Sequence, residues 1–90
     1  MYVLPTATGL ERDYLRALYE LAGRKAKNAV SHFEVRSELG RSDDEAERAC
    51  DFWADRGIVE WSSLGHVALT HLGLRRAERL AVKGWSHTPF

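Results

Sequence analysis

The amino-acid sequence predicts a mainly α-helical domain that contains one small β-hairpin. A capped helix over 42–56 runs directly into a β-branched and aromatic segment, 58–61. A second apolar run, 66–69, follows after a short loop that contains glycine. Two earlier stretches, 10–22 and 32–39, carry helical spacing or a helix start signal. This order predicts a winged helix-turn-helix: a three-helix core, a two-stranded wing and a C-terminal helix.

The amino-acid composition limits the classes of protein to which this chain can belong. The chain has 90 residues, 44% hydrophobic and 29% charged, which is ordinary for one small globular domain. Cys50 is the single cysteine, so neither a disulfide nor a thiolate zinc cluster is expected. Without a leader or an apolar run of ~18 residues, we expect a cytoplasmic protein that does not enter membranes. The formal net charge of zero weighs mildly against tight DNA binding, because compact nucleic-acid binders are usually basic.

Three segments divide the chain. Residues 1–9, with Pro5 and small side chains, form an N-terminal lead-in. Residues 10–83 form the winged helix-turn-helix domain. Residues 84–90 form a C-terminal tail, and we expect its aromatic side chains to fold back onto the domain or to meet a partner.

The first helix should span Leu10–Ala22. Its apolar side chains recur at helical spacing, and Gly23 ends it. The basic connector 24–28 follows, and its lysines are Lys25 and Lys27. We favour a solvated loop at the carbonyl end of a helix over a phosphate contact for this connector.

The second helix should span His32–Leu39, after a brief strand at Ala29-Val30. Ser31 and Glu34 have the spacing of a capping box. Gly40-Arg41 supplies the glycine-containing turn that a helix-turn-helix requires. The residues expected to face inward from this helix are Phe33, Val35 and Leu39.

The third helix begins at Ser42, whose side chain can accept a hydrogen bond from a first-turn amide, and Gly57 can end it. One face is apolar, with Trp53 filling the core and Cys50 acting as a small buried hydrophobe. That face comprises Ala46, Ala49, Cys50 and Trp53. The opposite face should meet solvent with four acids and one base: Asp44, Glu47, Arg48, Asp51 and Asp55.

The hairpin loop is predicted at Ser62–Gly65. It contains no lysine or arginine, which leaves His66 as its nearest candidate charge. Thr70 can cap a last helix, and one face of that helix is apolar through Leu74, Ala77 and Ala81. A second face is basic, and we slightly favour a solvated surface over an anion-binding one for it. That face comprises Arg75, Arg76, Arg79 and Lys83.

Four segments resemble the DNA-binding half of the diphtheria-toxin-repressor and manganese-transport-regulator family, and more loosely the MarR-type winged helices. They are Glu11–Leu21 as first helix, Val35–Gly40 before the turn, Arg56–Val59 entering the wing, and Leu69-Thr70-x-x-Gly73-x-x-x-Ala77 leaving it. The resemblance covers most of 10–80. It implies a winged-helix fold and a DNA-binding function.

Departures from that family concern its metal site. Asp13 stands where the family has its first ligand, but Arg16 stands where manganese-type members have a second carboxylate. The segment that would carry the other ligands and the dimer helices is expected to be absent, because the sequence ends at Phe90. Arg36 occupies a position that is usually small. We therefore expect no metal and no cofactor, and we place all four histidines at the surface: His32, His66, His71 and His87.

The leading interpretation is a small prokaryotic or phage transcriptional regulator that binds double-stranded DNA. The third helix would lie in the major groove and the hairpin would approach the backbone, although repeated acids on that helix oppose phosphate contact. The expected DNA contacts are Arg41, Ser42, Arg48, Arg56, Lys25, Lys27 and His66.

The alternative is a winged helix used as a protein-interaction module or homodimer. The stretch 42–60 holds seven acids and two bases, whereas 70–90 holds four bases and one acid. The residues expected to contact a partner are Asp44, Glu47, Asp51, Arg75, Arg76, Arg79 and Lys83. An enzyme with a small-molecule substrate is not expected: catalytic motifs are lacking, and the helix dipole explains the acids at 43–45.

Overall fold

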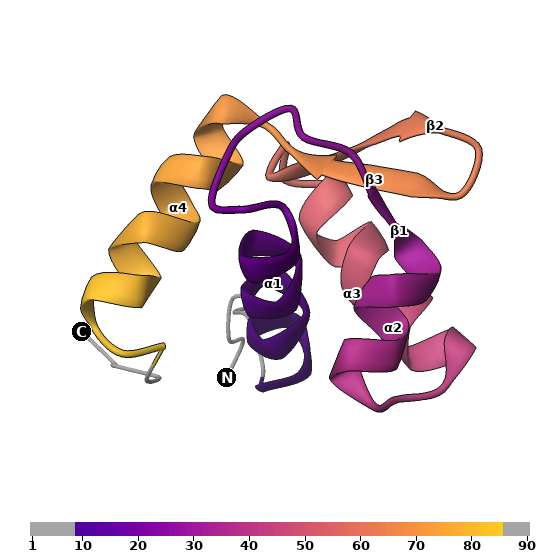
Figure 1. Cartoon of the computed structure of the whole chain (residues 1–90). Coiled ribbons are helices and arrows are strands. Elements are labelled where there is room, and N and C mark those ends of the chain that lie inside the picture. The colour runs from indigo at the N-terminus through magenta and orange to yellow at the C-terminus, as the bar shows by residue number, and fades with distance from the viewer. Residues whose placement is uncertain (1–8, 86–90) are drawn as a thin grey trace, which may run out of the picture.

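The computed structural model describes residues 9–85, which form four helices and three strands (Figure 1). Each predicted helix is present, with bounds that differ from the prediction by at most two residues. The elements in chain order are α1 (Gly9–Leu21), β1 (Val30–Ser31), α2 (His32–Leu39), α3 (Asp43–Ala54), β2 (Val59–Ser63), β3 (His66–Leu69) and α4 (His71–Val82).

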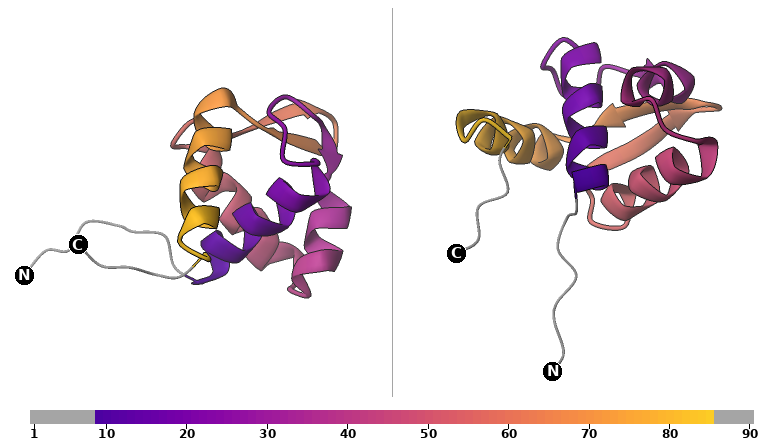
Figure 2. Two further views of the ribbon diagram at one scale, coloured as in Figure 1. Left: turned by 60° about the vertical axis from the view of Figure 1, so that its left-hand side comes forward. Right: turned by 90° about the horizontal axis from the view of Figure 1, so that it is seen from below.

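Helix α1 lies at the centre of the helical layer. It contacts α2 and α3 on one side and α4 on the other, and the small sheet lies across one end of the helices (Figures 1 and 2). The described part of the chain is therefore mainly helical with one small antiparallel sheet. No helix in residues 9–85 is both long and apolar enough to cross a membrane.

The sheet has three strands, in the order β1-β3-β2, because the brief strand expected at Ala29-Val30 is present one residue later as β1 and joins the two-stranded wing. Strand β1 pairs with β3 through Val30 opposite Val67, and β2 pairs with β3 along its length. The hairpin turn is also shorter than predicted, because β2 continues through Ser63 and only Leu64 and Gly65 connect the strands. Gly65 adopts a positive φ of 77°, which glycine reaches without steric cost.

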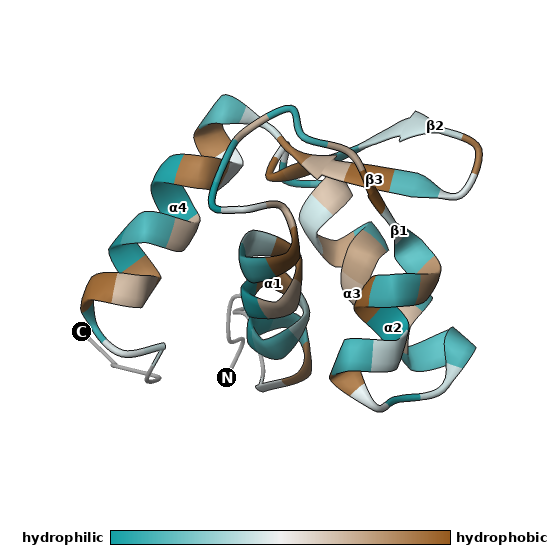
Figure 3. Ribbon diagram, viewed as in Figure 1, coloured by the Kyte–Doolittle hydropathy of each residue, from teal (hydrophilic) through white to brown (hydrophobic). Residues whose placement is uncertain are grey.

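A single core joins α1, α3 and β3. Trp53 is 1% exposed and is the largest fully buried side chain, and its indole Nε1 donates a hydrogen bond to the carbonyl oxygen of Glu11 at 2.7 Å. Ala46, Ala49 and Cys50 are buried beside it, which confirms the predicted apolar face of α3. Figure 3 shows the same alternation: hydrophobic bands interrupt the hydrophilic ones along α1 and α4, and β3 is mostly hydrophobic. The burial of the small residues lets α3 lie close to α1.

Helix α3 is capped as the sequence predicts. The Ser42 hydroxyl accepts a hydrogen bond from the Glu45 amide at 3.2 Å, and the Glu45 carboxylate accepts one from the Ser42 amide at 3.3 Å. This capping box satisfies amides that the first turn leaves unpaired. Thr70 caps α4 in the same manner, accepting from the Gly73 amide at 2.9 Å. Both helix starts are therefore fixed by local chemistry.

Two predictions for α2 are wrong. Ser31 makes no side-chain capping bond; it belongs to β1 and is paired with His66 on β3. Phe33 does not face inward but is 62% exposed. The reason is helical geometry, since Val35 is buried and a residue two positions earlier points to the opposite side.

The predicted return of the tail's aromatic residues is confirmed for Trp85. Its ring centroid lies 5.8 Å from that of Tyr19 on α1, and the side chain is partly buried against the core. Phe90 and the lead-in up to residue 8 lie outside the described residues.

Candidate functional site

The exposed side of α3 is strongly acidic. Asp44, Glu47, Asp51 and Asp55 are all exposed, as predicted, and we call these four residues the acidic α3 face. Arg48 lies among them and is also exposed. Between residues 32 and 60 the chain carries nine acids and four bases. The surface around α3 is therefore negative by several charges.

Most bases near α3 already have partners within the chain. Arg41 forms an ion pair with Glu45 at 3.4 Å, and the Arg36 guanidinium contacts Asp43 at 2.7 Å. Arg56 donates to the carbonyl oxygen of Phe52 at 2.8 Å and stacks on its ring. Among the described residues Arg48 makes no ion pair. Arg48 is thus the base on α3 that can contact a ligand without first breaking an ion pair.

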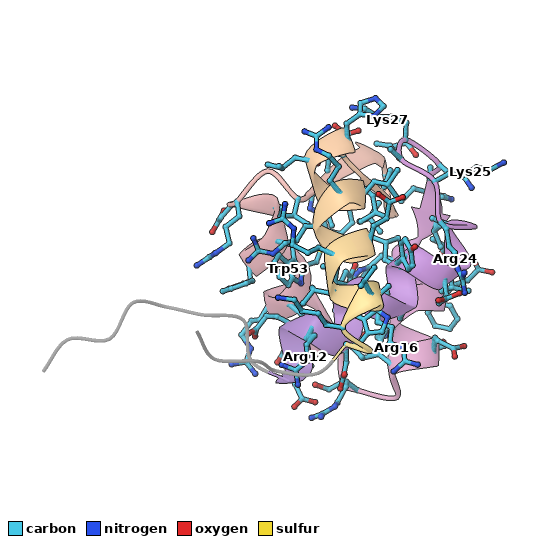
Figure 4. All side chains as sticks on the ribbon, turned by 90° about the vertical axis from the view of Figure 1, so that its left-hand side faces the viewer. Arg12, Arg16, Arg24, Lys25, Lys27 and Trp53 are labelled. Carbon is cyan, nitrogen blue, oxygen red and sulfur yellow. The ribbon has the colours of Figure 1, made fainter. Side chains whose placement is uncertain are left out.

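The basic connector is tied to other parts of the fold. Lys27 forms an ion pair with Glu60 on β2 at 2.8 Å, and its backbone amide donates to the Leu69 carbonyl oxygen at 2.8 Å. Arg24 pairs with Glu20 of α1. Lys25 is exposed (Figure 4). The connector is therefore fixed at the β3–α4 junction, where one of its two predicted DNA contacts, Lys27, is neutralised.

Sequence reasoning missed an apolar surface beside the hairpin. Phe33, Trp61 and Leu64 are 62%, 45% and 99% exposed, and we call them the apolar hairpin patch. His32 contacts two parts of the hairpin: its ring centroid lies 5.4 Å from that of Trp61, and its amide donates to the Gly65 carbonyl oxygen at 2.8 Å. Phe33 follows His32 at the start of α2. Exposed apolar side chains near one another are typical of binding surfaces. The sequence does contain one signal of this surface: Leu64, an apolar residue within the predicted hairpin loop.

His32 is half-buried, which corrects its prediction as a surface residue. A hydrogen bond of 2.9 Å joins its Nδ1 to the Tyr14 hydroxyl, and the rings are in contact. Burial lowers the pKa of His32, while the carboxylates of Glu47 and Asp43 oppose that shift. Glu47 and Asp43 therefore act on His32 across the contact between α2 and α3. His66 and His71 are exposed as predicted, and His87 lies outside the described residues.

Protonation of His32 should destabilise the domain. Its lowered pKa means that the unfolded chain binds the proton more readily, so stability is present above the ordinary value of 6.5 and falls as pH drops through the folded pKa. We expect the urea midpoint to decrease between about pH 7.5 and about pH 5. His32→Asn keeps an acceptor near Tyr14 without titrating and should flatten this dependence. A wild-type midpoint that is constant with pH would contradict the burial of His32.

Helix α4 presents a basic surface on the other side of α1. Arg75, Arg76 and Arg79 are exposed, and none forms an ion pair with another described residue; we call them the basic α4 face. Lys83 is exposed next to them, and Glu78 is the acid on this helix. Two exposed apolar residues, Leu72 and Val82, flank the arginines. This surface has the charge opposite to that of α3.

Cys50 is a buried thiol, and a hollow opens at the surface between α1 and α2. Burial raises the pKa of the Cys50 thiol to about 11, which keeps it protonated near neutral pH and weakens it as a nucleophile. Asp13 and Arg16 line an open hollow between α1 and α2 together with Glu20 and Glu38. In residues 9–85 no three His, Cys, Asp or Glu side chains are placed to hold a metal ion.

Comparisons of the chain with protein-family models, with characterised proteins and with solved structures found no match. The resemblance to the diphtheria-toxin-repressor family therefore stays a prediction from the sequence.

Proposed function

We propose that the chain is a winged-helix domain that binds a basic protein surface through the acidic α3 face and the apolar hairpin patch. The winged-helix interpretation is supported by the element order α1-β1-α2-α3-β2-β3-α4 and by the sheet order β1-β3-β2. In that arrangement α3 occupies the place of the helix that winged helices present to their ligands. The exposed side chains of α3 then determine which kind of ligand this helix can bind.

The charge of α3 carries the proposal. Two carboxylates neutralise the nearest arginines, Arg36 and Arg41, which leaves Arg48 alone among the four acids of the acidic α3 face. DNA phosphates would be repelled by those acids, since two like charges 4 Å apart cost about 1 kcal/mol even in water. Lysine and arginine side chains of a protein would be attracted by the same charges.

The apolar hairpin patch supports a protein partner for a second reason. Exposed aromatic residues such as Phe33 and Trp61 belong to the types enriched in protein interfaces, and tryptophan is often among the few residues that dominate the binding energy. Leu64, at the tip of the hairpin, would meet the DNA backbone with an apolar side chain and without a positive charge. A partner that is basic and partly apolar fits both surfaces.

A peptide titration tests this function. Labelled hexa-arginine should bind the wild-type domain, and its affinity should fall about tenfold, or ~1.4 kcal/mol, when Asp44→Asn, Glu47→Gln and Asp51→Asn are combined. The three positions are exposed, so folding should change little. Fluorescence anisotropy at low salt measures the affinity.

The matched control removes the same charge elsewhere. Glu34→Gln, Glu38→Gln and Glu78→Gln are exposed substitutions outside α3, so the two triple variants have equal net charge. The control should bind hexa-arginine nearly as the wild type does. An equal loss in both variants would indicate attraction by net charge alone and would refute a specific acidic α3 face.

DNA binding is the second candidate, and the helix arrangement is the observation that favours it. Ser42 caps α3 and Arg48 lies on its second turn, at the end of such a helix that reaches base edges in the major groove. This candidate requires Arg41 to release Glu45 and turn to a phosphate. It also requires the acidic α3 face to approach the duplex, which is why we place it second.

A further inference from the structure

We propose that the basic protein bound by the acidic α3 face is a second copy of this chain, which presents its basic α4 face. This inference rests on the proposed function and names its partner. The contact would place α3 of one protomer against α4 of the next.

Charge complementarity is the first argument. The segment 32–60 has five more acids than bases, whereas α4 with Lys83 has three more bases than acids. The arginines of the basic α4 face are exposed and form no ion pair with described residues, so they can meet carboxylates without breaking contacts inside the chain. Opposite charges on two faces of one chain steer its copies together.

The two faces are also comparable in length. The acids of the α3 face extend from Asp44 to Asp55, and the bases on and just after α4 extend from Arg75 to Lys83. At ~1.5 Å per residue these stretches span about 16 Å and about 12 Å along a helix. The acids recur every three or four residues and the bases lie within about two turns, so two such helices can align several opposite charges at once.

The positions of the faces define the symmetry of the contact. Helix α1 lies between α3 and α4, so the two faces are on different sides of the molecule (Figures 1 and 2). A contact between two different faces is heterologous, and each added copy leaves one face of each kind free. Association should therefore continue past a dimer as concentration rises, unless the chain of copies closes into a ring.

Complementation between two defective variants tests this geometry. The first variant combines Asp44→Asn, Glu47→Gln and Asp51→Asn, and the second combines Arg75→Gln, Arg76→Gln and Arg79→Gln. Each retains one intact face, so each alone should remain monomeric by analytical ultracentrifugation at ~50 mM salt. Mixed in equal amounts, they should form a species of twice the monomer mass and nothing larger, because only one intact pair of faces remains.

Wild-type protein under the same conditions should exceed the dimer mass as concentration rises, and added salt should reverse this. A charge-matched control, Arg16→Gln with Arg24→Gln and Lys25→Gln, removes bases outside α4 and should associate as the wild type does (Figure 4). A wild type that stays monomeric to about 1 mM, or a mixture that stays monomeric, would overturn the inference. If hexa-arginine still required the acidic α3 face in that case, the proposed function would stand with another partner.

Discussion

Trp53→Ala should unfold much of this domain. Trp53 is 1% exposed and its indole fills the space between α1 and α3. Truncating a buried tryptophan costs about 3–5 kcal/mol, and small domains have only about 5–15 kcal/mol of stability in total. The hydrogen bond from Nε1 to the Glu11 carbonyl oxygen is lost as well. Urea unfolding followed by circular dichroism measures the loss.

Two controls separate the causes of this effect. Trp53→Phe keeps most of the packing and removes the hydrogen bond, so it should cost a smaller amount, about 1–3 kcal/mol. Trp61→Ala removes an indole of the same size from the exposed hairpin patch and should change stability by less than about 1 kcal/mol. Equal unfolding midpoints for Trp53→Ala and the wild type would contradict the orientation of α3 and, with it, the exposure of the acidic α3 face.

Gly73→Ala should have the second-largest effect. A methyl group on Gly73 would overlap the carbonyl oxygen of Ile58, which is backbone and cannot rotate away. That carbonyl already accepts a hydrogen bond from the Thr70 amide at 3.0 Å, so α4 could make room only by moving from its own cap. Overpacking of this kind costs typically about 1–3 kcal/mol and more where the backbone is the obstacle.

The control for Gly73→Ala is the same substitution at Gly9. A methyl group there would meet only the end of the Arg12 side chain at 3.8 Å, within ordinary contact distance. Gly9→Ala should be neutral or slightly stabilising, because alanine has less freedom to lose in a helix. Thermal melting of both variants measures the difference. A Gly73→Ala domain as stable as Gly9→Ala would refute the close approach of α4 to Ile58.

The helices could be predicted because their signals are local. The predicted cap at Ser42 forms, and Glu45, three residues later, completes a capping box that the prediction did not include. The apolar period of α3 likewise places Trp53 inside. Ser31 carries the same local signal, but pairing with His66 on a distant strand draws it into β1. A contact between segments far apart in sequence overrides a local preference, and one sequence does not reveal such a contact.

The candidate site, too, could be predicted only where its residues are close in sequence. Helical period alone gives the four acids of the acidic α3 face. It does not give the ion pair of Lys27 with Glu60, which are 33 positions apart, or the meeting of His32 with Trp61. Both contacts depend on strand β1 and on the path of the connector, which bring together segments that are far apart in sequence. They give Lys27 a carboxylate partner on β2 and place His32 beside Trp61, and they support the protein ligand proposed above over DNA.

A titration with DNA, followed through the signals of the individual backbone amides of α3, tests most directly whether α3 binds protein and not DNA. Labelled wild-type protein is mixed with random-sequence duplexes, and then with any duplex enriched by selection, at about 150 mM salt. If α3 serves a protein partner, the amides of Asp44, Glu47 and Arg48 should show no saturable shift and selection should enrich no sequence. Saturable shifts there that weaken steeply with salt and disappear in Arg48→Ala would contradict the account and identify α3 as a DNA-reading helix.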